Sequence, residues 1–440
     1  MGQGLLNAIR SAPHDGANVA SHLSRHRAEG QTPALSIHIQ NMEQIKLAYG
    51  AGAAQAASDH VRSIIKFELR DGDHVGSAEY VLRRLNEHPV TYDGQRFHLN
   101  VSLAPTSDTG GCAIQASTVH GNPAFPDDAW CRCYRADMAL AVNLFSAMAD
   151  GRLMLAWQPV RHADDPSQIL YHECLVRIVN GEAVAADDAL QPVGDMVEAL
   201  ERLGLVRALD RHVMALAIAE LRIDASRKLG VNISALSLVG DHWWDETLAT
   251  LEQCPVFAKS LFIEITETAP MPSIVEAANL LGKLRHLGCQ IALDDFGTGH
   301  AAMRSILTLS PDVVKIDKFF IHHAKASPSG QRTLAHLIGL AESLGATVIV
   351  EGIENAADQK LAREAGAHWQ QGYHHGRPSM SRPWRLKEIS TFFGSADAVA
   401  ANLNAGPFAV AASLPGIALN RADPVFPLSQ IAPAPIGVRG

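Results

Sequence analysis

The sequence predicts an α/β protein in which a TIM-like (β/α)8 barrel follows a smaller α/β domain and precedes a disordered tail. Three observations favour this architecture. Short apolar runs alternate with amphipathic stretches through the middle of the chain, as in parallel α/β folds. The 440 residues allow two or three domains at about 150 residues each. A composition of 47% hydrophobic and 19% charged residues is typical of globular proteins.

Two irregular segments divide the chain. Between residues 105 and 130, clusters of Gly, Pro and Asp interrupt any periodicity and indicate a long loop or linker. The segment 395–440 is rich in Ala and Pro without helical or strand periodicity, and we expect it to be mostly disordered. The sequence therefore predicts an N-terminal unit with its linker at 1–134, a barrel at 135–394 and a tail at 395–440.

The middle unit repeats a strand followed by a helix. Each strand-like run is apolar, often β-branched, and ends in a polar residue. These runs are LMLAWQP (153–159), ILYHECLV (169–176), KLGVNIS (228–234), SLFIEITE (260–267), CQIALDD (289–295), DVVKID (312–317) and ATVIVEG (346–352). Between them, segments such as 195–222, 273–288 and 330–345 place apolar residues at helical spacing. Seven or eight such units fit a (β/α)8 barrel, and a doubly wound open sheet is the alternative.

Charge and cysteine content exclude several classes of protein. With 37 Lys and Arg against 46 Asp and Glu, the net charge is −9, and no basic block marks a nucleic-acid-binding face. An acidic protein can still act on a phosphate substrate if bound cations or a few basic residues offset the repulsion. Six scattered cysteines suit reduced thiols in a cytoplasmic protein. No apolar run approaches about 18 residues, so we expect no integral membrane segment.

Polar residues at the strand ends indicate a metal site. The carboxyl ends of barrel strands meet on one face, and the polar residues there are Glu173, Asn232, Glu264, Asp294, Asp295, Lys315 and Glu351. Burying several carboxylates together is costly unless divalent cations bind them. Carboxylate and amide oxygens without nearby His or Cys suit Mg²⁺ or Mn²⁺ rather than zinc.

The adjacent Asp294 and Asp295 suggest two ions rather than one. Paired metals about 3.5–4 Å apart are a standard device for attacking a phosphodiester. Lys315 suits the role of orienting the attacking water or stabilising the phosphorane charge. These residues predict metal-dependent phosphoester hydrolysis. An enolising barrel enzyme would use similar Mg²⁺ ligands and a Lys base, and it stays open as an alternative.

The same residues carry a family resemblance. From about residue 135 to 392 the chain resembles the EAL domain, the family of cyclic di-GMP phosphodiesterases. The matching motifs occur in family order as LAWQPV (155–160), ECLVR (173–177), NIS (232–234), EITE (264–267), DDFGTG (294–299), KID (315–317), EGIE (351–354) and QGYHHGRP (371–378). Any one of these motifs is weak evidence, whereas eight in order are highly specific.

The resemblance implies roles for these residues. Glu173, Asn232, Glu264 and Asp294 would hold the first metal, and Asp294, Asp295 and Glu351 the second. Lys315 and Gln371 would position the water, with Glu351 as the base. The residues implied to contact substrate are Gln158, Leu175, Arg177, Asp317 and Arg377. Glu267 would anchor the flexible loop of the DFGTG segment, in which Gly297 and Gly299 provide conformational freedom.

Three departures from the family pattern concern the site. Cys174 replaces the signature alanine, a small apolar exchange that we expect to be tolerated. After DFGTG the family usually has Tyr-Ser-Ser, whereas this chain has His300, Ala301 and Ala302, and the lost hydroxyls would loosen the loop. His374 and His375 are unusual beside Gln371, and we expect them to have no ligand role.

The N-terminal unit resembles a degenerate GGDEF domain, the family of diguanylate cyclases. Residues 34–52 match the first strand and helix of that family, and GSAEY (76–80) occupies the place of the GGDEF motif. The family's metal-binding aspartates fall at His38 and Ala78, and its substrate-binding Asn and Asp at Lys46 and Gln55. These residues are unsuited to that chemistry, so we expect no cyclase activity.

Two functions follow from the sequence. The first is hydrolysis of cyclic di-GMP to pGpG with Mg²⁺ or Mn²⁺, by a homodimer formed through the barrel. The second is a catalytically weak cyclic di-GMP receptor that signals through a protein partner, with the N-terminal domain as the contact. The altered loop motivates the second function, and the complete set of predicted ligands motivates the first.

Overall fold

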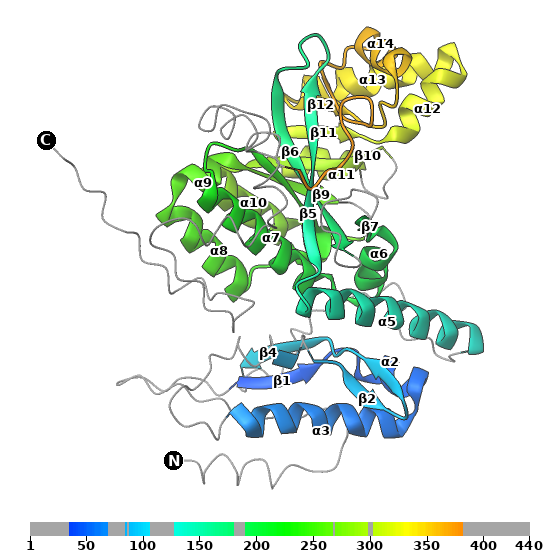
Figure 1. Cartoon of the computed structure of the whole chain (residues 1–440), viewed down its shortest axis with the longest axis vertical. Coiled ribbons are helices and arrows are strands. Elements are labelled where there is room, and N and C mark those ends of the chain that lie inside the picture. Colours follow the sequence, from blue (N-terminus) through cyan, green and yellow to red (C-terminus); the bar gives the residue numbers. More distant parts are fainter. Residues whose placement is uncertain are drawn as a thin grey trace, which may run out of the picture.

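The computed structural model describes residues 35–68, 84–85, 88–105, 127–179, 190–266, 269–297 and 302–381. Within these residues a smaller N-terminal unit and a larger barrel unit lie on opposite sides of one long helix, α5 (Asp128–Ala149) (Figure 1). The predicted disordered tail at 395–440, the GSAEY segment and Glu267 lie outside the described residues.

The barrel predicted from the alternation of strands and helices is confirmed. Eight strands form a closed sheet in the order β5-β13-β12-β11-β10-β9-β8-β6, because β5 also pairs with β6. The closed sheet excludes the doubly wound alternative. The strands are β5 (Leu153–His162), β6 (Ile169–Val179), β8 (Leu229–Ser234), β9 (Leu261–Thr266), β10 (Gln290–Phe296), β11 (Val313–Ile316), β12 (Thr347–Val350) and β13 (Trp369–Gln370). The short β7 (Leu190–Pro192) adds to the edge of β6.

One strand departs from the parallel order. β5 runs antiparallel to both of its neighbours, β6 and β13. Only residues 163–168 separate β5 from β6, and a parallel crossover needs about a dozen residues or more. The short connection therefore requires a hairpin.

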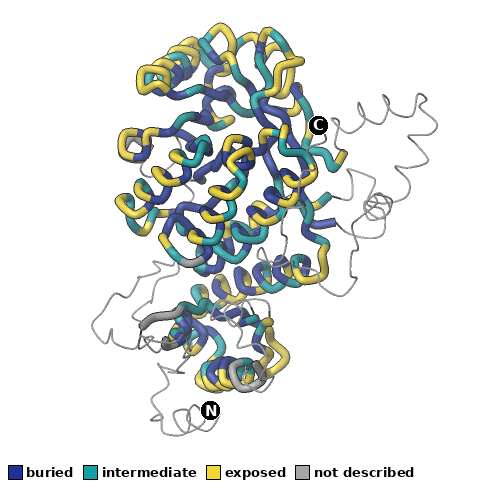
Figure 2. The backbone as a smooth tube through the Cα atoms, turned by 90° about the vertical axis from the view of Figure 1, so that its left-hand side faces the viewer, coloured by how far each residue is buried: buried dark blue, intermediate teal, exposed yellow. Residues whose placement is uncertain are grey.

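Helices cover the outside of the barrel. They are α6 (Gly194–Leu203), α7 (Val206–Ile223), α8 (His242–Gln253), α9 (Pro255–Ser260), α10 (Ile274–Leu287), α11 (Ala302–Leu309), α12 (Lys318–Ala326), α13 (Pro328–Ser343) and α14 (Ala356–Glu364). Their ends follow local sequence signals. In α10, the Ser273 side chain accepts a hydrogen bond from the Glu276 amide, and Gly288 ends the helix in the left-handed conformation. Figure 2 shows the buried residues along the inward faces of these helices.

Two apolar layers form the barrel's core. The larger layer lies between the strands and the surrounding helices and continues into the N-terminal unit. The smaller layer fills the interior of the barrel and consists of Val160, Tyr171, Phe262, Ala292, Val313 and Ile349. The rings of Tyr171 and Phe262 stack at a centroid distance of 4.3 Å. We call this interior layer the barrel floor, because the polar residues of the site lie directly above it.

The N-terminal unit packs against α5. β1 (Leu35–Ile39) pairs antiparallel with β4 (Val101–Pro105), and β2 (Val90–Tyr92) with β3 (Gln95–Phe97), beside helices α2 (Met42–Tyr49) and α3 (Ala51–Glu68). The side chain of Asp127 caps the first turn of α5 by accepting a hydrogen bond from the Trp130 amide at 2.7 Å. The boundary predicted at residues 134 and 135 falls inside α5, which is continuous across both units.

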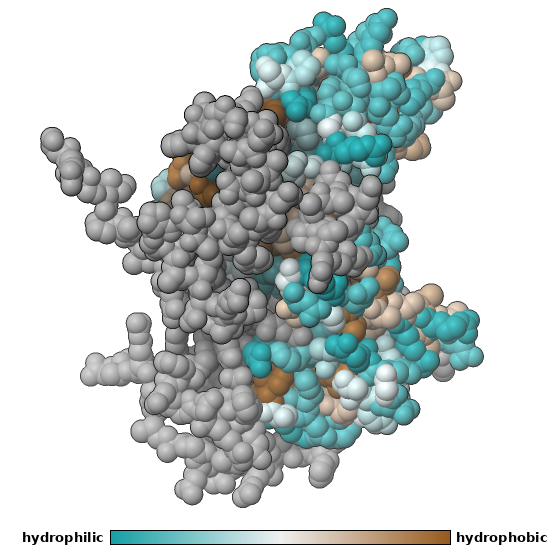
Figure 3. Space-filling view, in the orientation of Figure 1, coloured by the Kyte–Doolittle hydropathy of each residue, from teal (hydrophilic) through white to brown (hydrophobic). Residues whose placement is uncertain are grey.

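No helix in the described part of the chain combines the length and the apolar character needed to span a bilayer. On the face shown in Figure 3, the surface over α12, α13 and α14 is mostly hydrophilic.

Candidate metal centre

The position of the barrel floor along each strand determines which residues form the site. Successive side chains of a strand point to opposite faces, so residues two apart share a face. Each polar site residue lies two positions after a residue whose position faces the barrel interior. The pairs are Tyr171 and Glu173, Gly230 and Asn232, Phe262 and Glu264, Ala292 and Asp294, Val313 and Lys315, and Ile349 and Glu351. Six strands therefore contribute one polar side chain each to a single layer above the floor.

On the antiparallel strand β5, the site residue precedes the floor residue instead of following it. Gln158 lies two positions before the floor residue Val160, and it is paired with Glu173 of β6 in the sheet register. Gln371 follows β13 and completes the layer, since its Nε2 lies 3.4 Å from Oε1 of Gln158. Gln158 in turn donates to the carbonyl of Gly376 at 3.1 Å. The two amides close the ring of polar residues.

Lys315 lies at the centre of the carboxylates. Its Nζ is 2.7 Å from Glu264 Oε2, 2.9 Å from Glu351 Oε1, 3.1 Å from Asp294 Oδ1 and 3.4 Å from Glu173 Oε2. Only 1% of the Lys315 side chain is exposed, so these ion pairs are shielded from water. One ammonium group therefore faces four buried or half-buried carboxylates.

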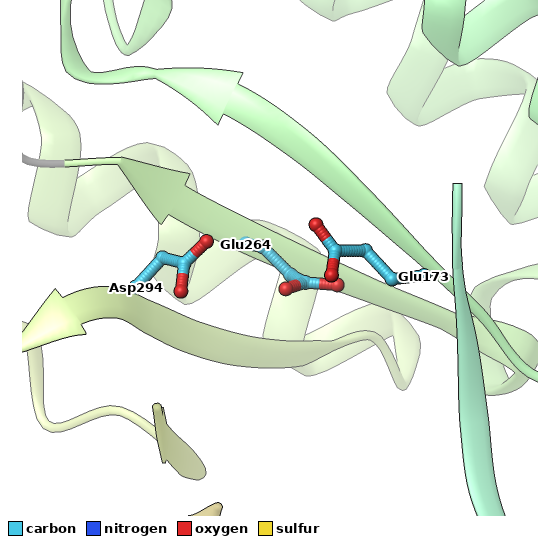
Figure 4. A group of neighbouring side chains, drawn as sticks. All are labelled: Glu173, Glu264 and Asp294. Atoms are coloured by element: carbon cyan, nitrogen blue, oxygen red, sulfur yellow. The ribbon is translucent and has the colours of Figure 1, made fainter. Parts of the chain in front are cut away.

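The carboxylates fall into two groups that share Asp294. Glu173, Glu264 and Asp294 each place one oxygen within 4.8 Å of the others, and so do Asp294, Asp295 and Glu351. Figure 4 shows the first three carboxylates directed toward one another between neighbouring strands. The same carboxylates were expected from the sequence to hold two metals. The sequence-predicted ligands are thus brought together in the two predicted groups.

Two adjacent aspartates reach the same space because the strand is irregular there. Asp295 has a φ of 53°, in the left-handed region, and the register between β10 and β11 shifts between Leu293 and Phe296. In a regular strand Asp294 and Asp295 would point to opposite faces. Asp tolerates the left-handed conformation better than most residues. The irregularity therefore gives both carboxylates access to Glu351.

Unpaired oxygen atoms indicate that the site fits a cation. Asn232 Nδ2 donates to Glu173 Oε1 at 2.7 Å, which turns its Oδ1 away from Glu173. Among the residues the structure describes, neither Asn232 Oδ1 nor Glu264 Oε1 accepts a hydrogen bond, although both atoms are buried. Buried oxygens without a donor are costly unless a ligand satisfies them. An oxygen-only donor set of this kind suits Mg²⁺ or Mn²⁺.

The protonation equilibria show the excess of negative charge. Burial and the neighbouring carboxylates raise the pKa of Glu264 well above its usual range, the pKa of Glu351 to about 8 and that of Asp295 to about 7. Burial opposes the charged form of Lys315, but the carboxylates outweigh it and raise the Lys315 pKa well above 10.5. Five carboxylates thus exceed what one lysine neutralises, and divalent cations would supply the missing positive charge.

Glu173 differs from the other carboxylates. Burial opposes its ionisation, yet the Lys315 charge and hydrogen bonds from Asn232 and Gln371 lower the pKa of Glu173. Lys315, Asn232 and Gln371 therefore favour the charged form of the Glu173 carboxylate.

The residues expected to contact substrate lie in varied environments. Leu175 and Arg177 are partly buried on β6, and Arg177 Nη1 donates to the carbonyl of Val176 at 2.8 Å. Arg377 is exposed, with its guanidinium 4.3 Å from the centroid of the Tyr373 ring. Asp317 caps α12 by accepting a hydrogen bond from the Phe319 amide at 2.8 Å. Asp317 thus has a structural role in addition to the expected one.

The departures from the family pattern lie in three places. Cys174 is buried in the outer core, on the face of β6 opposite Glu173, so its side chain points away from the site. The imidazoles of His374 and His375 lie 3.1 Å from side-chain oxygens of Gln359 and Gln370 respectively. In the altered loop, His300 and Ala301 lie outside the described part of the chain, and Ala302 is the first residue of α11. Glu267, which matches the family pattern, also lies outside the described part.

Two features that support the site were not predicted from the sequence. Gly230 leaves room for the Glu264 carboxylate, and a glycine inside a strand is the available signal for such a close approach. A buried polar group just beyond the end of β8 consists of Glu201, Asp210, Ser234 and Ser237. Helical periodicity offered no signal for this group, because its carboxylates lie on two helices that also contribute to the core.

Comparisons with known proteins agree with the motifs. A sequence model of the EAL domain matches residues 141–378, which is 238 of the 440 residues. The match does not include the N-terminal unit, whose resemblance to the GGDEF family stays a prediction.

Curated relatives share about half of the chain. The cyclic di-GMP phosphodiesterase NbdA of Pseudomonas aeruginosa is 29% identical over 247 residues, covering 55% of this chain and 31% of the relative. The cyclic di-GMP phosphodiesterase PdeF of Escherichia coli is 28% identical over 247 residues, covering 55% of this chain and 32% of the relative. The chain therefore spans about a third of the length of these two relatives. Among solved structures, an EAL domain protein from Listeria monocytogenes is 23% identical, with a TM-score of 0.48, covering 58% of this chain and 97% of that one.

Proposed function

Because the chain belongs to the EAL domain family, we propose that it is a phosphodiesterase that hydrolyses cyclic di-GMP to linear pGpG with two Mg²⁺ or Mn²⁺ ions. The observation that carries this proposal is the layer of five carboxylates, Asn232 and Lys315 above the barrel floor. The names of NbdA and PdeF supply the substrate class.

The two carboxylate groups would each hold one ion. Glu173, Asn232, Glu264 and Asp294 would bind the first, and Asp294, Asp295 and Glu351 the second. Two bound divalent cations supply a water of lowered pKa and stabilise the charge on the entering and leaving oxygens. The Asn232 Oδ1 and Glu264 Oε1 atoms, which lack donors among the described residues, support the first assignment.

The chain's own residues would orient the water and move its proton. Lys315 carries three N–H donors at the centre of the layer, and Gln371 offers an amide beside Glu173. Glu351 is the proposed base, since its carboxylate lies at the edge of the layer and contacts Lys315 at 2.9 Å. In the overall step water adds to phosphorus, one ring P–O bond breaks, and the leaving oxygen takes up a proton.

Basic and polar residues around the layer are proposed to bind the substrate. Arg177 and Arg377 suit phosphate oxygens or guanine edges, since the guanidinium group donates in a planar fork. Gln158, Leu175 and Asp317 are proposed to complete the contacts.

The remaining expectations are proposals of the same kind. Residues 1–134 would form a regulatory domain without cyclase activity, 135–394 the phosphodiesterase barrel, and 395–440 a tail. The barrel would form a homodimer, with Glu267 anchoring the adjacent loop and the N-terminal domain as a contact for a protein partner. The nucleotide substrate and the unpaired spacing of the cysteines support a cytoplasmic location.

The test is hydrolysis of cyclic di-GMP by the full chain, with product followed by chromatography. We expect pGpG with Mg²⁺ or Mn²⁺ and none with EDTA. Glu173→Ala should abolish turnover, whereas Glu252→Ala, which removes an exposed carboxylate of α8, should leave it unchanged. Binding of cyclic di-GMP without any product would refute the proposal and establish the receptor function instead.

A further inference from the structure

Helix α6 is tied to the N-terminal side of the molecule by an ion pair. The guanidinium of Arg202 donates to both carboxylate oxygens of Asp137 on α5, at 2.8 and 2.9 Å. Asp137 is 7% exposed and the Arg202 side chain 31%, so the carboxylate is shielded from water and the guanidinium is partly shielded. Paired N–H···O bonds of this geometry are stronger and more directional than a single contact. The pair therefore fixes α6 relative to α5.

A second contact joins the end of α6 to the N-terminal unit. The side chain of Asn100 donates to the carbonyl of Gly204, the C-cap of α6, at 3.1 Å. The Asn100 amide donates to the side chain of Asn41 at 2.8 Å, and Asn41 is 2% exposed. Asn41 precedes α2, so the contact reaches the interior of the N-terminal unit. Two independent contacts thus couple α6 to the elements that precede the barrel.

The neighbouring residue of α6 holds the end of a metal-binding strand. Glu201 is 5% exposed, and its Oε1 accepts a hydrogen bond from Ser234 Oγ at 2.6 Å. The Ser234 amide donates to Asp210 of α7 at 3.1 Å. Ser234 ends β8 and lies two residues after Asn232. The carboxylates of α6 and α7 therefore hold the end of β8, two residues beyond Asn232.

We propose that α6 transmits movements of the N-terminal unit to the metal centre, with Arg202 and Glu201 as positioning residues for Asn232. The inference rests on the proposed function, because it concerns the affinity of the proposed metal site. Arg202 and Glu201 are adjacent on one rigid helix, so a displacement of α5 carries both. A shift of Ser234 then moves the Asn232 Oδ1 atom relative to Glu173 and Glu264. The N-terminal unit thereby regulates metal affinity without contacting the metal.

The test is titration of the full chain with Mn²⁺ in a calorimeter. We expect Arg202→Met and Asp137→Asn each to weaken Mn²⁺ binding by about 2–10-fold. The double variant should bind Mn²⁺ as tightly as the single variant of lower affinity, since each substitution removes the same link between α5 and α6. Glu201→Ala should weaken binding by about 10-fold or more, as expected for a residue that orients a ligand.

A matched control separates this effect from general destabilisation. Arg285 of α10 pairs with Asp312 at 3.2 Å, and its side chain is 33% exposed, compared with 31% for Arg202. Asp312 binds the Ile291 amide at the start of β10, at the opposite end of the barrel from the site. Arg285→Met should therefore lower stability but leave Mn²⁺ affinity unchanged. An equal loss of affinity in both arginine variants would overturn the inference.

The remaining outcomes distinguish the inference from the proposed function. If Glu173→Gln loses Mn²⁺ binding while Arg202→Met retains full affinity, the metal site stands and the relay through α6 is wrong. If the wild-type chain binds no Mn²⁺, the proposed function fails. Amide hydrogen exchange of the metal-free chain then decides the relay: faster exchange over residues 229–234 in Arg202→Met, and not in Arg285→Met, supports it. Unchanged exchange there overturns it.

Discussion

Gly230 controls the position of a buried carboxylate, which makes Gly230→Ala a sharp test of the site. A Cβ atom at this position would lie 1.9 Å from Glu264 Oε1 and 2.5 and 2.9 Å from two carbons of the Tyr171 ring. Both neighbours are fully buried, at 0% and 1% exposure, so neither can move into solvent. Because β8 lies between β6 and β9 in the sheet, the backbone of Gly230 has little freedom to retreat.

The expected loss follows from overpacking. An extra methyl group in a packed core costs about 1–3 kcal/mol. For a unit of this size, each kcal/mol lowers the melting temperature by about 2–4 °C, so the expected decrease is about 2–12 °C. The Glu264 carboxylate must also leave its position beside Gly230, so Mn²⁺ affinity should fall at the same time.

The assay is thermal unfolding followed by circular dichroism, with and without Mn²⁺. Gly282→Ala provides the control, because Gly282 is exposed in α10 and its Cβ would meet no atom within 4 Å. Replacing a helical glycine by alanine should stabilise the protein by about 0.5–1 kcal/mol. The two substitutions should therefore shift the melting temperature in opposite directions. An unchanged melting temperature in Gly230→Ala would refute the close packing of Glu264 against β8.

Three further predictions concern charge and capping. Lys315→Met should lower the free energy of unfolding, measured by urea denaturation at pH 8 with EDTA, by about 3–5 kcal/mol. The loss should be smaller at pH 6, because Glu351 and Asp295 take up protons there. An equal loss at both pH values would contradict this account. Burial raises the pKa of Asp210 to about 7. The folded state therefore retains a proton on Asp210 that the unfolded chain releases near pH 4. The stability that this proton contributes is lost as the pH rises toward and through 7. Asp210→Asn should remove that pH dependence from the urea midpoint, whereas Asp245→Asn, which changes an exposed residue of α8, should preserve it. Asp127→Ala should lower stability by about 1 kcal/mol through loss of the α5 cap, and a thermal midpoint equal to that of the wild type would show that the cap contributes nothing.

The layer of site residues was largely predictable from the sequence. Alternation along each strand places Glu173, Glu264 and Lys315 on the interior face once the strands are assigned. The shared mouth of a barrel then brings residues of distant segments together, which is why single strand-end residues could be combined into one site. The placement in the site of residues that follow this regular geometry could be predicted without the three-dimensional structure.

Features that depend on irregular backbone or on long-range packing were not predictable. The left-handed conformation of Asp295 departs from strand alternation, so the adjacency of Asp294 and Asp295 suggested a shared two-ion site, but no pattern in the sequence predicted the backbone irregularity that brings both side chains there. The contact of Glu201 with Ser234 joins a helix to a strand end across 33 residues, and no periodic pattern reports such a pair. The antiparallel direction of β5 was implicit in the short 163–168 connection, whereas the strand and helix pattern suggested a uniform order.

The reversed direction of β5 decides which end of the barrel a preceding domain occupies. The register pairs Leu153, at the start of β5, with Ile178, beyond Glu173 on β6, so the strand begins on the side of the mouth and descends toward the floor. Had β5 been parallel, the chain would have entered from below, and α5 with the N-terminal unit would lie at the closed end. Because β5 is antiparallel, the domain that precedes it lies beside the end of the barrel that carries the site residues. Exchanging the N-terminal unit for another domain would therefore keep the new domain near that end of the barrel, where its movements or bulk can affect access to the site.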